Sequence, residues 1–213
     1  DLKIGFAEID FTEWPDEPLR PAFTTALATV KSMGGQMVES RLPDFPYGPV
    51  IGTIIDSEAA SIFEVFIRSG QVEGLADQGQ IAGLKALMNY SALDYLKAMR
   101  VRAQIQAAFR KLFSDLDLLV APTRFSLPDR ADRPFDETEP KRPDQRGIGF
   151  ALGQASNLCG LPAMTVPCGF VNALPIGLQI VGPPFSENRI ISFAREFQRR
   201  TDFHKQHPPA ITA

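Results

Sequence analysis

Cysteine and histidine are scarce in this 213-residue sequence, which contains two of each. Cys159 and Cys168 form no CxxC pair, and a secreted chain of this length would often carry more cysteines. We therefore expect a cytoplasmic, reducing setting without a disulfide. His204 and His207 lie in a C-terminal tail, where we expect no metal site.

Long apolar runs and an excess of one charge sign are also missing. The sequence has 22 basic and 25 acidic residues, for a formal net charge of −3. A nucleic-acid-binding protein would need a clustered basic face, and a membrane span needs about 18 consecutive apolar residues. We expect a soluble protein with neither a nucleic-acid nor a membrane partner.

The sequence contains no serine-nucleophile motif of the GxSxG type and no pair of glycine-flanked serines. Cys168 stands between Pro167 and Gly169 in an apolar stretch, and a nucleophilic thiolate needs a cation or a helix N-terminus beside it. We interpret this cysteine as a packing residue. No catalytic residue can be named from the motifs, and neither a metal nor a cofactor is expected.

The first part of the sequence predicts a strand–helix–strand unit followed by helices. Residues 2–9 and 36–42 are short and apolar, and a helix between them begins near Pro18 and Pro21. Such a unit is typical of a parallel sheet covered by helices. Residues 46–87 read as mostly helical, and Ser91 opens a long helix with a capping-box pattern.

The second part predicts strands at 117–123, 163–168 and 176–181, with helices at 147–158 and after Ser186. The expected fold is therefore α/β, a mixed β-sheet flanked by helices, in a single domain over residues 1–203. Residues 124–146 are rich in charge and proline, which predicts a lid or a disordered insertion. We expect residues 204–213 to form a flexible tail.

The segment from Asn157 to Glu187 carries the most specific pattern in the sequence. Its blocks are NLCGLPA (157–163), VPCGF (166–170) and LPIGLQIVG (174–182). With DLLVAPT at 117–123 and LKIG at 2–5, they resemble the amidase signature family, which includes bacterial amidases and the A component of aminoacyl-tRNA amidotransferases. The resemblance spans nearly the whole chain and keeps the order of its elements.

This resemblance implies a hydrolase of carbon–nitrogen (amide) bonds. The family uses a Ser–Ser–Lys triad, with backbone N–H groups that stabilise the oxyanion. In the family these residues lie in a glycine- and serine-rich N-terminal half, which nothing in this chain matches. We expect the chain to be a C-terminal portion excised from such an enzyme and to be inactive alone. Its expected partners are a small amide substrate and the missing N-terminal portion; a homodimer is left open.

The resemblance also implies part of a substrate-binding wall. The matching positions are Thr123 and Phe125 after the third strand, Phe150 and Gln154 on the following helix, and Asn157 at its end. The amidotransferase A components place an acidic residue about seven positions before that asparagine, where it binds the α-amino group of glutamine. Phe150 cannot make that charge-assisted contact. The difference favours a more apolar amide over glutamine.

Three alternatives compete with the hydrolase interpretation. The chain could be a non-catalytic binding or scaffold protein derived from the family, or the A component of a glutamine-dependent tRNA amidotransferase. The opening strand–helix–strand unit also suggests a flavodoxin-like domain. That domain would need a phosphate-binding loop after Ile9, and the sequence gives Asp10-Phe11-Thr12-Glu13 without glycine.

Overall fold

The computed structural model describes residues 2–128 and 147–206. It divides into two compact units: residues 1–43 with 109–213, here the sheet unit, and residues 44–108, here the helical unit. The expected single domain over residues 1–203 stays a prediction. Most of the predicted charged loop, residues 129–146, and of the predicted tail, residues 207–213, lies outside the described residues.

The sheet unit is built on five strands in the spatial order β2-β1-β3-β5-β4. β1 (Lys3–Phe6) pairs in parallel with β2 (Gln36–Glu39) and β3 (Leu118–Pro122). β5 (Leu174–Val181) pairs antiparallel with both β3 and β4 (Ala163–Val171). The mixed sheet predicted from the sequence is therefore confirmed.

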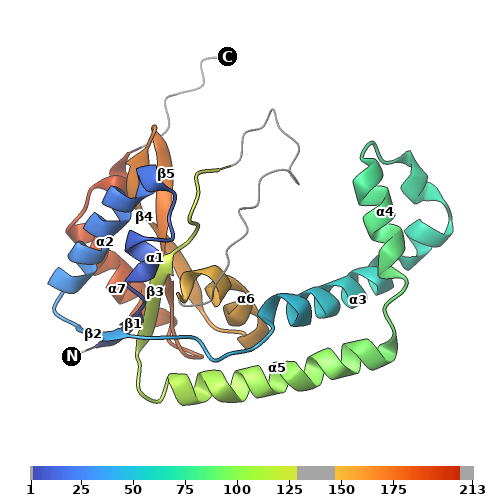
Figure 1. The fold of residues 1–213 in the computed structure, drawn as a ribbon, viewed down its shortest axis with the longest axis horizontal. Helices are drawn as coiled ribbons and strands as arrows, with labels where there is room; N and C mark the ends of the chain where they lie inside the picture. The colour runs from blue at the N-terminus through green and yellow to red at the C-terminus, as the bar shows by residue number, and fades with distance from the viewer. Residues whose placement is uncertain (1, 129–146, 207–213) are drawn as a thin grey trace. The chain divides into compact units, whose positions relative to one another are not determined.

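One face of this sheet is covered by α2 (Arg20–Ser32) and α7 (Glu187–Arg199), as Figure 1 shows. Both helices repeat apolar residues at helical spacing, so each presents one apolar stripe to the strands. The side chains that form this core are buried: Phe23, Leu27, Val30, Ile190, Phe193 and Phe197 from the helices, and Ile4, Leu118, Val120, Leu178 and Ile180 from the strands.

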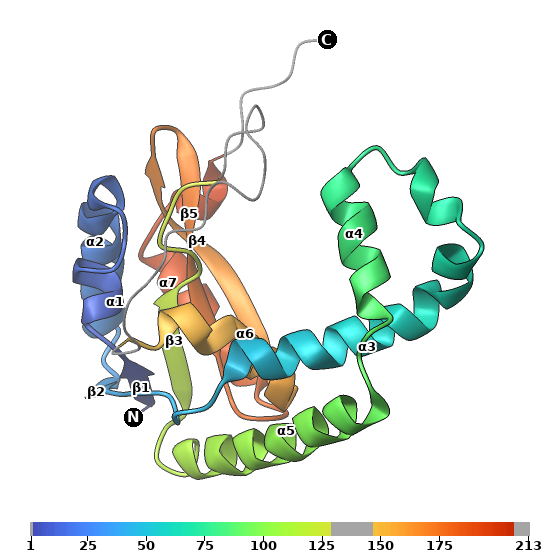
Figure 2. The same ribbon diagram turned by 45° about the vertical axis from the view of Figure 1, so that its right-hand side comes forward.

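The other face of β3 carries α6 (Gly149–Cys159), on the side of the sheet away from α2 (Figure 2). Successive strand residues point to opposite faces. Leu118 and Val120 thus enter the core with α2, whereas Ala121 faces the start of α6. The helix ends at Cys159 and is capped by Gly160, whose φ of 67° is the left-handed conformation that glycine adopts without strain.

The first strand is shorter than the sequence predicts. β1 ends at Phe6, and Ile9–Thr12 form a short helix, α1, followed by the 3₁₀ turn η1 (Glu17–Leu19). The expected strand to residue 9 is wrong because the backbone turns at Ala7, whose carbonyl accepts the N–H of Asp10 at 3.1 Å.

The turn between β4 and β5 is tighter than predicted. The sequence suggests a seven-residue link over 169–175, but the strands continue to Val171 and resume at Leu174. Asn172 and Ala173 make the turn with φ values of 52° and 62°. Positive φ at both central residues is the geometry of a two-residue hairpin turn that matches strand twist.

The helical unit consists of α3 (Tyr47–Arg68), the 3₁₀ turn η2 (Gln71–Gly74), α4 (Gln78–Leu87) and most of α5 (Ala92–Leu112). The Asp77 side chain caps α4 by accepting the N–H groups of Gly79 and Gln80. The predicted capping box is also present before α5. Ser91 and Asp94 exchange backbone-to-side-chain hydrogen bonds of 3.3 and 3.2 Å.

The last described element is the 3₁₀ turn η4 (Phe203–Lys205). Among residues 2–128 and 147–206, no helix has both the length and the apolar character that crossing a lipid bilayer requires.

Candidate functional site

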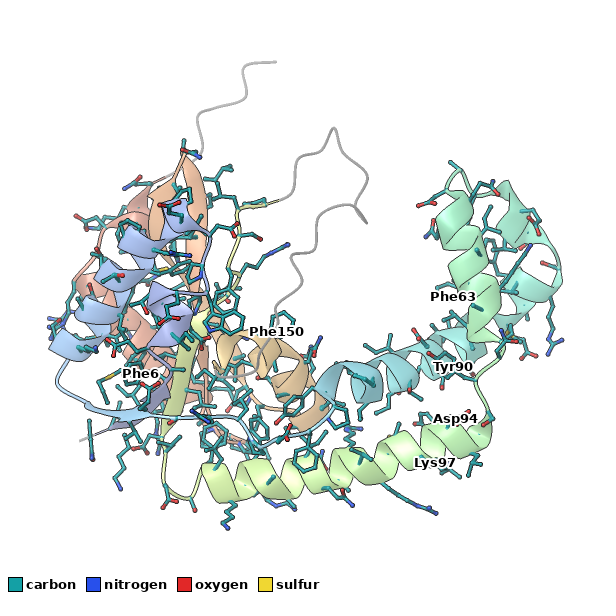
Figure 3. All side chains as sticks on the ribbon, viewed as in Figure 1. Phe6, Phe63, Tyr90, Asp94, Lys97 and Phe150 are labelled. Carbon is teal, nitrogen blue, oxygen red and sulfur yellow. The ribbon has the colours of Figure 1, made fainter. Side chains whose placement is uncertain are left out.

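Three of the five residues predicted to contact substrate share one face of α6. Phe150, Gln154 and Asn157 stand at positions i, i+4 and i+7 and are all exposed. The opposite face is buried on β3 through Leu152 and Ala155. Phe150, 54% exposed, lies in the first turn of the helix (Figure 3). A helix that buries one face and exposes a phenylalanine beside amide side chains can contact an uncharged, partly apolar molecule.

The start of α6 is held by a side chain from the other end of the sequence. Asp10, only 1% exposed, accepts the backbone N–H groups of Ile148 and Gly149 through Oδ2, each at 2.8 Å. Burial raises the pKa of Asp10 to about 6. The two hydrogen bonds lower it and the charge of Glu39 raises it further, with smaller effects.

Close packing around this carboxyl requires glycine at two positions. A Cβ on Gly147 would lie 1.9 Å from Asp10 Oδ1, and a Cβ on Gly149 would lie 2.8 Å from Cζ of Phe125. Neither the carboxyl group nor the phenylalanine ring is at the surface, so neither has free space into which to move. The Gly147-Ile148-Gly149 sequence therefore fits around Asp10 and Phe125.

Phe125 itself points into the protein. Its side chain is 7% exposed, and its ring centroid is 6.3 Å from that of Trp14. Its carbonyl also accepts the N–H of Asp16 at 2.8 Å. In the described residues the Phe125 ring packs against Gly149 at the start of α6. Its direct contact with a substrate stays a prediction.

Thr123 lines a separate cavity of about 300 Å³ at the edge of β3, β4 and β5. Its hydroxyl lies 3.3 Å from that of Thr165. Gly177 is needed beside this pair, because a Cβ there would lie 2.7 Å from the Thr165 methyl. Phe150, Gln154 and Asn157 do not line this cavity, so the structure groups the α6 residues but does not join Thr123 to them.

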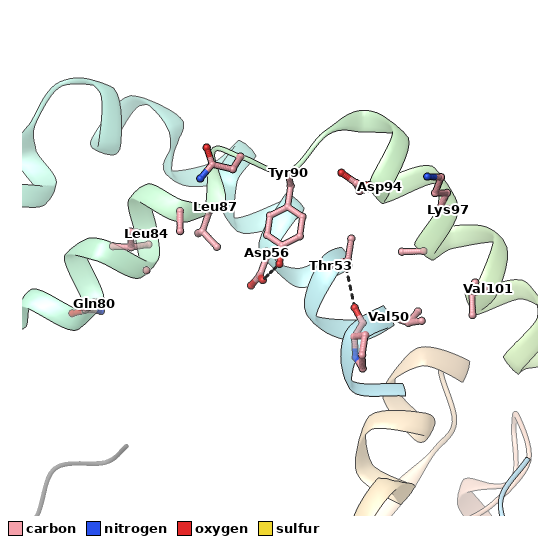
Figure 4. Close-up of a pocket in the computed structure, with 15 residues that line it drawn as sticks. Val50, Thr53, Asp56, Gln80, Leu84, Leu87, Tyr90, Asp94, Lys97 and Val101 are labelled. Atoms are coloured by element: carbon pink, nitrogen blue, oxygen red, sulfur yellow. Dashed lines mark hydrogen bonds between the residues drawn. The ribbon is translucent and has the colours of Figure 1, made fainter. Parts of the chain in front are cut away.

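The helical unit contains its own cavity, of about 1030 Å³, between α3, α4 and α5. Its wall is mainly apolar, and its polar groups include Asp56 and Tyr90, joined by a 2.8 Å hydrogen bond (Figure 4). The hydroxyl of Tyr90 donates to the carboxylate of Asp56, and this bond raises the pKa of Tyr90. The sequence patterns do not predict a binding role for any residue of this cavity.

Two other kinds of reactive group can be assessed, the Cys168 thiol and clusters of metal-binding side chains. Burial raises the pKa of the Cys168 thiol to about 12, so it is protonated at neutral pH. In residues 2–128 and 147–206, no group of three His, Cys, Asp or Glu side chains is arranged to hold a metal ion.

Sequence reasoning missed Asp10. The sequence pattern around Asp10 served only to argue against a phosphate-binding loop. The residues that it contacts lie more than 130 positions away, so no local pattern connects them. Gly147 before α6 and Gly149 at its first position were the available signal, because such glycines often mark a close approach to another group.

The comparison with protein families decides the assignment. The family model described as Amidase matches residues 1–191. This chain belongs to the amidase signature family. Its predicted membership is thereby confirmed, and the matched range includes the segment from Asn157 to Glu187.

The curated relatives of this amidase-family chain include components of amidotransferases. It is 31% identical to the A component of glutamyl-tRNA(Gln) amidotransferase from Dechloromonas aromatica, covering 99% of the chain and 47% of the relative. The corresponding protein of Methanosarcina mazei is 32% identical, with 99% and 48% covered. The chain thus spans about half the length of the curated relatives it matches.

Solved structures share the fold. A bacterial aryl acylamidase of the amidase signature family superposes with a TM-score of 0.72 at 18% identity, covering 96% of this chain and 44% of that one. Another structure, described as an amidase, gives 0.75 at 23% identity, covering 93% and 45%. At these identities the likeness establishes the fold, a mixed sheet flanked by helices, and no more.

Proposed function

We propose that this chain is the C-terminal portion of an amidase signature hydrolase that acts on carbon–nitrogen (amide) bonds. The Ser–Ser–Lys triad of that chemistry lies outside this chain, and the chain contributes part of the substrate-binding wall. The match of the Amidase family model over residues 1–191 carries the proposal.

The side chains on α6 support the assignment of a wall. Phe150, Gln154 and Asn157 are exposed together on a helix whose other face is fixed on the sheet. Gln154 and Asn157 can donate and accept hydrogen bonds to an amide group, and Phe150 supplies apolar area. We infer a small amide whose group next to Phe150 is uncharged and apolar.

Exposed apolar side chains of the helical unit support its contact with another protein surface. Several of its large apolar side chains are exposed, among them Ile62 at 76%, Val65 at 78% and Leu93 at 58%. Soluble proteins rarely leave many such groups in water without a partner surface. Since the chain spans about half of its relatives, we assign these side chains to contact with the missing portion of the same enzyme.

A second candidate is the A component of an amidotransferase, favoured by the curated relatives of that name. It requires recognition of the charged α-amino group of glutamine. An acidic residue would make that contact, and Phe150 stands at the position where the resemblance places it. The hydrolase of an apolar amide is therefore preferred.

The test compares the chain alone with the longer protein read from the gene upstream of Asp1, using p-nitroacetanilide as substrate. Loss of a whole triad typically lowers the rate by about a millionfold, so the chain alone should release no p-nitroaniline above background. The longer protein should release it, and a serine-directed reagent should stop the reaction. Reagent-sensitive hydrolysis by the chain alone, or an inactive longer protein, would contradict the proposal.

A further inference from the structure

Asp10 links the start of α6 to α1, the short helix that follows β1. Its side chain enters the protein from α1, and its Oδ2 accepts two consecutive backbone N–H groups, those of Ile148 and Gly149. These are N–H groups that a helix of this kind leaves without an intrahelical partner. The carboxylate therefore defines where α6 begins and satisfies its first donors.

The contact acts directly on the exposed face of α6. Gly149 is the residue before Phe150, so the hydrogen bond at 2.8 Å fixes the peptide that leads into that side chain. Gln154 and Asn157 follow on the same face, one and two turns later. Because a helix is rigid over this length, a shift of its first turn moves all three side chains together.

Stability alone does not explain a carboxyl group at this position. Asp10 is 1% exposed, and its Oδ1 atom accepts no hydrogen bond within the part of the chain that the structure describes. An asparagine would offer the same acceptor to Ile148 and Gly149 without a buried charge. A buried acceptor that is costly for folding yet closely surrounded is more often found where its position serves the site.

We propose that Asp10 is a positioning residue of the amide-binding site, which holds the Phe150–Gln154–Asn157 face of α6 where a substrate contacts it. This inference rests on the proposed function. Asp10 does not touch the substrate; it acts through the backbone of Gly149. Its effect should therefore appear in KM, because a wall residue contributes equally to ground-state and transition-state binding.

The test uses the longer protein with three substitutions. Asp10→Ala removes the acceptor; Asp10→Asn keeps an acceptor oxygen; and Glu13→Gln makes the same carboxyl-to-amide change at a nearby exposed residue. With p-nitroacetanilide, Asp10→Ala should raise KM roughly tenfold with little change in kcat, since a displaced wall weakens binding. Asp10→Asn should restore a KM close to that of the parent protein, and Glu13→Gln should leave both constants unchanged.

Hydrogen exchange at the amides of Ile148 and Gly149 separates failure of this inference from failure of the proposed function. Asp10→Ala should speed exchange there at least tenfold, and Asp10→Asn should not. An unchanged KM in a folded Asp10→Ala protein, or unchanged exchange, would overturn the positioning role. If the parent protein hydrolyses no amide, the proposed function fails, and the exchange rates still decide whether Asp10 positions α6. If Asp10→Ala does not fold, an Asp10→Asn protein in which exchange at Ile148 and Gly149 is faster while KM is unchanged would overturn the role.

Discussion

Asp10 Oδ2 accepts the backbone N–H of Gly149 at 2.8 Å, across 139 positions in the sequence. The contact joins the short helix α1, which follows the first strand, to the first turn of α6. It makes the arrangement of the candidate site depend on one buried carboxyl group, and it gives that group a measurable influence on stability.

The pH dependence of unfolding should report the protonation of Asp10. Its pKa is raised from 3.8 to about 6, mainly by burial. Between these values the folded protein holds more protons than the unfolded one, so the free energy of unfolding falls as pH rises from about 4 to 6. The loss attributable to Asp10 is about 3 kcal/mol. Urea unfolding at several pH values should show this loss in the parent chain and not in Asp10→Asn; parallel pH profiles would contradict it.

Two glycines of α6 should respond in opposite directions to alanine. In Gly149→Ala the new Cβ would lie 2.8 Å from Phe125 and 3.3 Å from the Cβ of Ala121, and overpacking of this kind costs about 1–3 kcal/mol. Gly153→Ala meets nothing within 4 Å and should raise the free energy of unfolding by up to about 1 kcal/mol. Urea unfolding measures both, and equal effects would show that the start of α6 is not tightly packed.

The β4–β5 turn should be stabilised by glycine. Ala173 has a φ of 62°, which a side chain disfavours by about 1 kcal/mol. Ala173→Gly should therefore raise the melting temperature. Ala103→Gly on the exposed face of α5 is the matched control and should lower it, because glycine is about 1 kcal/mol less favourable in a helix. A destabilised Ala173→Gly protein would refute the turn geometry.

The Cys168 thiol should be inert in the folded protein. It is 1% exposed, and its pKa is raised to about 12 by burial. In a Cys159→Ala variant, which isolates Cys168, Ellman's reagent should react only after unfolding in guanidinium. Rapid reaction in native buffer at pH 8 would show that this thiol is accessible, and would reopen its interpretation as a packing residue.

The hydrophobic periodicity of the sequence was sufficient to predict most of the secondary structure. Val101, Ile105 and Phe109 recur at helical spacing within α5, and the apolar runs at 117–123 and 176–181 predicted β3 and β5. These signals are local, because each element buries one face at its own period. Where Phe6 ends the first strand, the apolar pattern continues to Ile9 and gives no sign of the turn.

The candidate site was less predictable, for a physical reason. The exposure of Phe150, Gln154 and Asn157 follows from helical spacing once α6 is known. The burial of Phe125 and the anchoring role of Asp10 depend on contacts between segments distant in sequence. A single sequence carries no direct record of such contacts.

The central claim is that the longer protein hydrolyses an amide that lies against α6. Its preference between two substrates tests this claim most directly. We expect kcat/KM for p-nitroacetanilide to exceed that for glutamine at least a hundredfold, because Phe150 offers no charge to the α-amino group of glutamine. Phe150→Asp should narrow that ratio by at least tenfold. A parent protein that prefers glutamine, with Phe150→Asp making no difference, would contradict both the assigned substrate class and the role of α6.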